Sequence, residues 1–265
     1  RAAPVDEAAL HRDFGDRFSE RDETRWDAGR RALVAERVRR FAGIVLDSRP
    51  TGRPDPAAAA QALTDAVRSL GLEVLPWSDA LGQWRARVAG LRAWMPELGL
   101  PDLGDDALMA TLDHWLRPAF KGKSRLDALG ADDLSNALRA SLDWALQQKL
   151  DALAPVRITV PSGQARVIDY AIGDDGAPRP PVLAVKLQEL FGLADTPRIA
   201  DGRVPLLLHL LSPAGRPLQV TADLRSFWDR TWSEVRREMK GRYPRHPWPE
   251  DPWNAVPTHR ARPRG

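Results

Sequence analysis

The chain has 265 residues, of which 43% are hydrophobic and 28% are charged, and 39 basic side chains stand against 36 acidic ones. This balance is typical of one or two folded domains and excludes wholesale disorder, whereas a net charge of +3 does not by itself require a nucleic acid. The lack of cysteine excludes disulfides, thiolate metal sites and a cysteine nucleophile, and favours a cytoplasmic location.

The first segment, residues 1–50, is predicted to be a partial, β-rich accessory segment of OB-like type. A short helix is expected over 6–18, followed by antiparallel strands over 23–48. The strands are indicated by Ala32, Val34 and Val38, which occupy alternate positions and would face the same side of a strand. The same stretch also fits a helix over 30–42, and that alternative stays open. Residue 1 is arginine rather than methionine, so we expect a piece of something longer.

The second segment, residues 51–155, is predicted to be a helical bundle. It follows a break at 49–56, where three prolines and a glycine continue neither strand nor helix. Apolar residues at helical spacing predict helices over 56–70, 77–94, 105–117 and 132–153, with aspartates at several starts. Six tryptophans lie on apolar stripes and are expected in the core: Trp84, Trp94, Trp115, Trp144, Trp228 and Trp232.

The third segment, residues 156–265, is predicted to be a C-terminal α+β domain. Period-two patterns indicate a hairpin over 156–170 and further antiparallel strands over 182–185, 204–211 and 218–220. A closing helix over 223–239 is expected to end at Gly241, and a tail rich in proline and tryptophan follows it. The longest apolar run, 204–211, is too short to cross a membrane, so no membrane partner is expected. The fold class of the whole chain is therefore α+β.

The sequence contains only incomplete motifs for catalysis or metal binding. The Gly122-Lys123-Ser124 tripeptide lacks the upstream glycine and strand of a phosphate loop. The five histidines are scattered, and paired aspartates stand where helix caps and turns explain them. We expect no catalytic residue and no metal site in this chain.

Three stretches together carry a resemblance to a known family. They are residues 190–199, residues 204–221, and Phe227-Trp228 followed by residues 234–249. They resemble the C-terminal region of the bacterial HrpB family, which are ATP-dependent RNA helicases of the DEAH-box type. The resemblance covers most of the chain and is strongest over 144–260.

This resemblance implies a non-motor region that guides RNA and braces two RecA-like lobes of the same parent chain. ATP and magnesium would be bound by those lobes, which are missing here, so this chain needs no cofactor of its own. The parent is expected to hydrolyse nucleoside triphosphates, and the fragment alone is not.

One basic stretch could contact nucleic acid, because cations bind phosphates and rings stack on unpaired bases. A weaker second patch is Lys121 with Lys123, and Arg216 in a hairpin turn is a third candidate. The residues of the first patch are Arg236, Arg237, Lys240, Arg242, Tyr243, Arg245 and Trp248, followed by Arg260, Arg262 and Arg264. The competing interpretation is a solvated helix face whose tryptophans pin the tail to the body.

Three functions remain open at this point. The first is a helicase accessory region that binds RNA, with single-stranded RNA as one option. The second is a protein-docking module without direct RNA contact, whose tail meets a partner or the motor lobes. The third is a stand-alone hydrolase. It ranks last because the sequence shows no catalytic nucleophile together with a general base.

Overall fold

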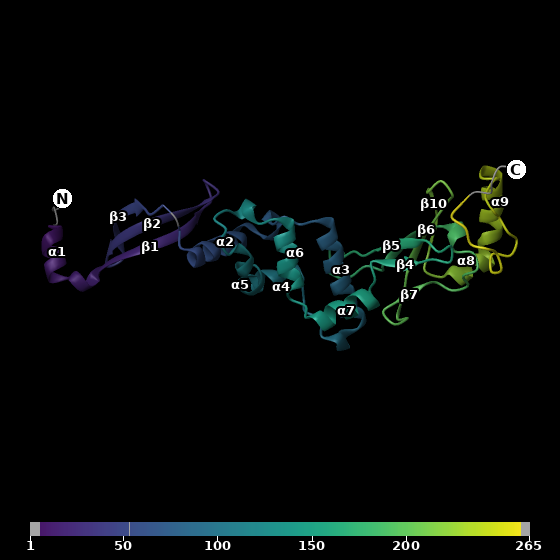
Figure 1. Cartoon of the computed structure of the whole chain (residues 1–265), viewed down its shortest axis with the longest axis horizontal. Helices are drawn as coiled ribbons and strands as arrows, with labels where there is room; N and C mark the ends of the chain where they lie inside the picture. The colour runs from purple at the N-terminus through teal and green to yellow at the C-terminus, as the bar shows by residue number, and fades with distance from the viewer. Residues whose placement is uncertain (1–5, 53, 261–265) are drawn as a thin grey trace. The chain divides into compact units, whose positions relative to one another are not determined.

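The computed structural model describes residues 6–52 and 54–260. Internal contacts divide the chain into two compact units (Figure 1). The first unit runs to Ser78 and includes Asp105–Ser141, and the second comprises Asp79–Gly104 and the chain from Leu142 onward. The predicted helical segment 51–155 therefore contributes to both units. The division into three domains stays a prediction.

The first unit begins with a small antiparallel sheet that follows a short helix, α1 (Glu7–Asp13). Its strands pair in the order β1-β2-β3, with Phe18 opposite Phe41 in the first pair. Their bounds are β1 (Phe18–Asp27), β2 (Ala32–Phe41) and β3 (Ile44–Pro50). The strand prediction is thus confirmed, and the alternative of a helix over 30–42 is wrong.

Helices complete the first unit. Asp55 accepts hydrogen bonds from the backbone N–H groups of Ala57 and Ala58, which starts the first of them after the proline-rich break. These helices are α2 (Pro56–Leu70), α4 (Asp105–Ala110), α5 (Leu112–Trp115) and α6 (Ala131–Arg139). The continuous helix expected over 105–117 is wrong, because it breaks at Thr111. The Thr111 hydroxyl donates to the carbonyl oxygen of Ala107 at 2.7 Å, a contact that bends helices.

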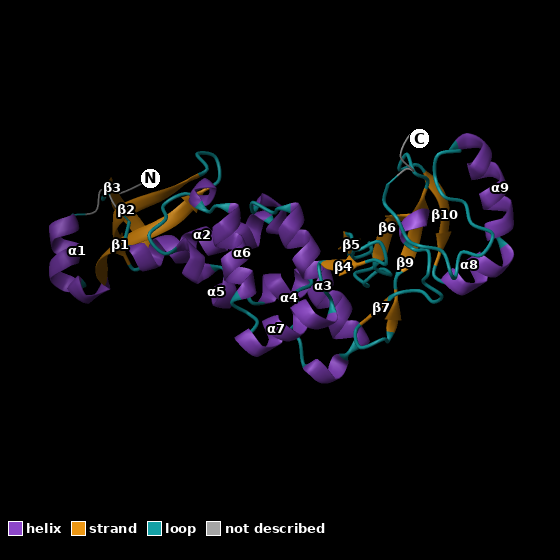
Figure 2. Ribbon diagram, turned by 45° about the vertical axis from the view of Figure 1, so that its right-hand side comes forward, coloured by secondary structure: helices purple, strands orange, loops and turns teal. Residues whose placement is uncertain are grey.

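The second unit is built around a five-stranded sheet with the strand order β10-β9-β6-β5-β4 (Figure 2). Its strands are β4 (Arg157–Thr159), β5 (Ala165–Asp169), β6 (Val182–Lys186), β9 (Leu207–Leu211) and β10 (Pro217–Thr221). β7 (Arg198–Ile199) and β8 (Val204–Pro205) form a separate ribbon between β6 and β9. The sheet is antiparallel as expected except for β6 and β9, which run parallel because the ribbon carries the chain back before β9 begins.

The described part of the second unit also contains the α-helices α3 (Asp79–Trp94), α7 (Trp144–Leu153), α8 (Leu224–Arg230) and α9 (Trp232–Arg242). The single closing helix predicted over 223–239 is wrong in two respects. It breaks at Thr231, and Gly241 lies inside α9 instead of ending it. The helix ends at Arg242 because the residue before Pro244 is driven out of the helical conformation.

The tryptophans test the predicted core. Trp84, Trp115, Trp228 and Trp232 are buried as expected, and Trp94 is half-buried. Trp144 is 76% exposed, so its assignment to the core is wrong: it is the first residue of α7, and that helix buries Leu150 instead. The α+β fold class is confirmed, with helices and mostly antiparallel sheets in both units.

Candidate nucleic-acid interface

The basic stretch at the end of the chain lies on α9 and the turn that follows it. Arg236 is directed to the tail: its Nε donates to the carbonyl oxygen of Trp248 at 2.9 Å, and its Nη2 pairs with Glu250 at 2.9 Å. One predicted phosphate-binding cation is therefore engaged in holding the tail.

Trp248 also packs instead of facing solvent. The residue is only 7% exposed, its Nε1 donates to the Tyr243 carbonyl oxygen at 2.8 Å, and its ring lies 6.1 Å from that of Trp232. Trp232 in turn donates to the carbonyl oxygen of Pro249. A ring so enclosed has no free face for a base, so Trp248 lies outside the exposed part of this stretch.

Tyr243 joins the end of α9 to the β9–β10 hairpin. Its hydroxyl donates to the Ser212 hydroxyl oxygen at 3.5 Å, and the same oxygen accepts the backbone N–H of Arg216 at 3.1 Å. Ser212 is 1% exposed and also donates its own backbone N–H to the Arg216 carbonyl at 2.8 Å. The first and third predicted patches, separated in sequence, thus meet through one buried serine.

Four exposed cations result from this arrangement: Arg216 on the hairpin, Arg237 and Lys240 on α9, and Arg245 on the following turn. We call these four residues the α9 basic surface. Within residues 6–52 and 54–260, none of the four has an ion-pair partner. Arg237 and Lys240 are three residues apart and so lie on one side of the helix. Arg242 forms an ion pair with Glu238 at 3.3 Å, but both side chains are more than half exposed and the pair is weak.

The end of the chain contributes less. Arg260 is exposed and donates through Nε to the His259 ring at 3.1 Å. Arg262 and Arg264 lie outside the described residues.

Burial and charge both act on His246, which follows Arg245. Its Nδ1 is 3.1 Å from the Nε2 atom of the buried Gln188 side chain. Desolvation, and secondarily the nearby charge of Lys186, lowers the pKa of His246. The imidazole is therefore held neutral against the body of the unit.

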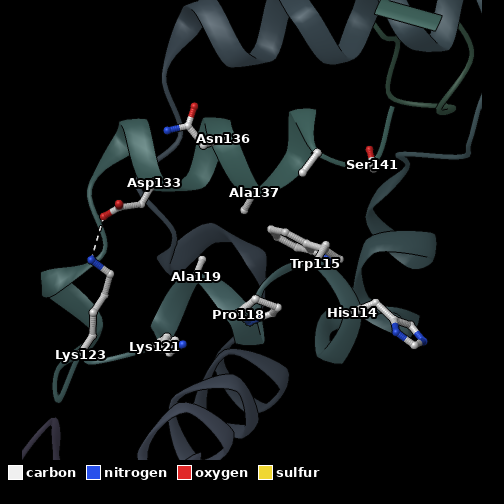
Figure 3. Close-up of a pocket in the computed structure, with 11 residues that line it drawn as sticks. His114, Trp115, Pro118, Ala119, Lys121, Lys123, Asp133, Asn136, Ala137 and Ser141 are labelled. Atoms are coloured by element: carbon white, nitrogen blue, oxygen red, sulfur yellow. Dashed lines mark hydrogen bonds and ion pairs between the residues drawn. The ribbon is translucent and has the colours of Figure 1, made fainter. Parts of the chain in front are cut away.

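The second predicted patch lies in the first unit, at a pocket of about 560 Å³ between α6 and the α5–Phe120 segment (Figure 3). Lys121 is exposed there and, among the described residues, has no partner. Lys123 instead binds Asp133 at 2.9 Å, and this ion pair spans one end of the pocket, as the dashed line in Figure 3 shows. Hydrogen bonds from Lys123 and from the Gly130 N–H lower the pKa of Asp133.

The local structure around Gly122-Lys123-Ser124 does not fit a nucleotide triphosphate. The tripeptide follows a 3-10 turn, Arg117–Phe120, and no strand leads into it. Among the described residues, no group of three or more His, Asp or Glu side chains could hold a metal ion, and no helix could cross a membrane.

Sequence reasoning missed Ser212 because a serine in a hairpin turn has an ordinary local explanation. The interaction that gives it importance joins positions 31 residues apart. It also missed the exposed His114 and Asn136, which line the pocket beside Lys121. Neither belongs to a recognisable motif, so no signal in the sequence marks them.

Comparisons with known proteins give a consistent result. Residues 115–252 match a family model described as "ATP-dependent helicase C-terminal". The chain is 43% identical over 241 residues to ATP-dependent RNA helicase HrpB of Escherichia coli, covering 91% of this chain and 29% of that protein.

Two solved structures agree with this match. A crystal structure of the E. coli DExH-box NTPase HrpB superposes with a TM-score of 0.76 at 41% identity, over 97% of this chain and 31% of that one. A structure of the E. coli DEAH/RHA helicase HrpB gives 0.67 at 40% identity, over 88% and 29%. The chain thus spans less than a third of the length of these relatives.

Proposed function

Because the chain belongs to the HrpB family of ATP-dependent helicases, and matches its C-terminal region, we propose that it is the non-motor part of a DEAH-box RNA helicase. In this proposal RecA-like lobes elsewhere in the parent chain bind ATP and magnesium and hydrolyse the nucleotide. The present region binds the RNA that those lobes move. An RNA substrate also agrees with the cytoplasmic location expected from the sequence.

The α9 basic surface is where we propose that RNA binds. Its exposed cations suit phosphates along a single strand, a mode of binding that reads charge and not sequence. Arg242 joins them when RNA phosphates replace Glu238 as its partner, since an exposed ion pair stabilises by only about 0–1 kcal/mol.

The observation that carries the proposal is the Tyr243–Ser212–Arg216 link. Without it, Arg216 and the α9 cations would be isolated charges of the kind found on most surfaces. With it, the hairpin that carries Arg216 is held against the C-terminal end of α9, while the acidic Glu250 of the tail pairs with Arg236 of α9. Tyr243 positions the surface and is not itself offered for stacking.

Charge reversal tests this surface. We expect Arg237→Glu, Lys240→Glu and Arg245→Glu together to weaken RNA binding across all sequences. The slope of log affinity against log salt should flatten by about one unit for each phosphate that the variant no longer neutralises. Fluorescence anisotropy with a labelled single-stranded RNA at several salt concentrations measures both quantities.

A matched control reverses three other exposed cations of the same unit, Lys149, Arg157 and Arg179, and changes the net charge equally. If both triple variants lose the same affinity, only net charge matters and the α9 basic surface is not a site. If neither variant changes the slope, the proposed function fails.

We propose a second role, bracing of the motor lobes, for the exposed Trp144. Of the ten tryptophans, all of them described, only Trp144 is exposed to this degree. Large aromatic side chains of this kind are enriched at protein interfaces. Trp144→Ala is expected to weaken binding to separately produced lobes without changing RNA binding by the isolated region.

The docking alternative based on the tail has less support. The tail packs against its own unit through Trp248, through the Gly192 N–H to the Pro252 carbonyl, and through the Thr258 N–H to the Gln188 carbonyl. These contacts hold the tail against its own unit. Tight binding to the lobes with no RNA affinity at any salt would nevertheless favour this alternative.

A further inference from the structure

The pocket beside Lys121 has the features of a ligand site. Its volume of about 560 Å³ falls within the range of roughly 300–1,000 Å³ found for small-molecule pockets. Apolar side chains from both walls face the space, with Ala137 of α6 opposite Trp115 and Pro118 (Figure 3). Polar groups stand around them, which is the usual composition of such sites.

Three of those polar groups have no partner among the described residues. They are the Lys121 ammonium, the His114 imidazole and the Asn136 amide, all on exposed residues. The neighbouring cation, Lys123, is neutralised by Asp133, so the charge left at the mouth is positive. An anion that also carries hydrogen-bonding groups complements this set.

We propose that this pocket seats one nucleotide of the bound RNA, with its base against the apolar walls and its phosphate at Lys121. The base would lie between Ala137 and Pro118, which line opposite sides of the pocket, and we call this part of it the apolar slot. This inference rests on the proposed function, because it names a base-binding subsite for the same RNA.

A nucleotide fits these observations better than an acidic peptide does. A peptide carboxylate would be satisfied by Lys121 alone and would have no use for the apolar slot. A base with its phosphate accounts for the slot and the cation together. Since bases differ in their edges but all have flat faces, we expect weak preference among them.

The test compares two ligands with equal numbers of phosphates: a short oligouridylate and an abasic ribose-phosphate chain of the same length. Wild-type protein should bind the oligouridylate roughly ten-fold more tightly, in line with the contribution of one buried base. Ala137→Phe fills the slot, so it should make the two affinities equal and leave the abasic chain unaffected. Ala140→Trp, at an exposed lining position, gives the same result if Ala137→Phe fails to fold.

The phosphate contact is tested separately. Lys121→Glu should weaken binding of both ligands, whereas Arg12→Glu, at an exposed position on α1 of the same unit, should change neither. A base preference that survives both slot variants overturns the inference, because the base would then bind elsewhere.

Mononucleotide binding separates failure of this inference from failure of the proposed function. Saturation-transfer NMR with AMP and UMP should show contact in the wild type and none in Ala137→Phe, even if the α9 basic surface binds no RNA. Two results together would overturn the base-binding pocket and leave the proposed function intact. They are the absence of a mononucleotide signal and equal wild-type affinities for the two oligomers. An oligoglutamate peptide that binds in the slot while AMP does not would overturn it too, by showing a protein ligand instead.

Discussion

Arg87 is a buried cation that completes the end of a helix. The residue is 5% exposed; its Nε donates to the Ala154 carbonyl at 2.6 Å, and its Nη2 reaches Asp151 and the Leu150 carbonyl. Ala154 is the residue that follows α7, and its carbonyl lies where a helix end leaves carbonyl groups without intrahelical donors. The Leu150 carbonyl also accepts the Ala154 N–H at 3.0 Å, so Arg87 is its second donor. Sequence patterning places Arg87 on α3 but does not reveal this contact, because the interaction spans more than 60 residues.

We predict that Arg87→Met destabilises the second unit by about 1–3 kcal/mol, because the buried Ala154 carbonyl loses its donor and the Leu150 carbonyl loses its second one. Arg87→Lys should recover only part of this loss, since one ammonium does not reproduce the forked guanidinium. Chemical denaturation followed by far-ultraviolet circular dichroism measures both. Equal stability of wild type and Arg87→Met would show that water satisfies these carbonyls.

His246 makes the stability of the same unit depend on pH. Because burial lowers its pKa, the unfolded chain binds a proton at a pH where the folded chain does not. The stabilising effect is complete above the unfolded value of about 6.5 and is lost as pH falls through the lower folded value.

We therefore predict that the unfolding free energy falls as the pH drops below the unfolded value of about 6.5, and that it falls less in His246→Gln. Urea titrations at several pH values give the comparison. The two proteins should be measured first at pH 7.5, where equal m-values show that both unfold from a similar compact state. The same slope in both proteins would assign the pH dependence to other groups.

At the scale of elements, the sequence predicts most helices and strands, because apolar periodicity and capping residues are local signals. The Asp55 cap is an example, because its side chain accepts backbone N–H groups at the start of α2. The continuous helix expected over 132–153 is wrong: it divides into α6 and α7, and Asp143 accepts the Leu146 N–H at the start of the second. Other errors, unlike the helix break at Thr111, have non-local causes. The helix break at Thr231, the parallel pairing of β6 with β9 and the exposure of Trp144 depend on what packs against each segment.

The candidate site shows the same limit. The sequence identifies the basic residues of α9, since charge is visible in composition. It does not show that Arg236 binds the tail, that Trp248 is enclosed, or that Ser212 brings Arg216 to α9. Each of these facts changes which residues are free to bind RNA, and each depends on contacts between segments that are separated in the sequence.

The tail behaves as a structural element although it has little regular structure. Trp248 packs beside Trp232, which contacts Phe191 with ring centroids 5.6 Å apart. We predict that Trp248→Ala destabilises the second unit by about 3–5 kcal/mol, as removal of a buried aromatic ring does. Val256→Ala is the control, because Val256 is 82% exposed. Denaturant midpoints that are equal for the two variants would contradict a packed tail.

At the scale of the whole molecule, each compact unit has its own core. Leu138 of α6 is fully buried in the first unit, and the Trp228–Trp232–Trp248 cluster is buried in the second. Units with separate cores unfold as separate cooperative transitions unless their interface is large. We therefore expect two calorimetric transitions, with Leu138→Ala lowering one midpoint and Trp248→Ala the other.

Ligand binding should also distinguish the two units, because each ligand should raise the unfolding midpoint of the unit that binds it. RNA phosphates on the α9 basic surface would raise the midpoint of the transition that Trp248→Ala lowers, because a ligand of the folded state stabilises the unit that binds it. AMP in the pocket beside Lys121 would raise the midpoint that Leu138→Ala lowers. Differential scanning calorimetry with each ligand at several concentrations measures these shifts. A single transition that both variants lower equally would show that the two cores unfold together, and stabilisation would then not assign either ligand to a unit.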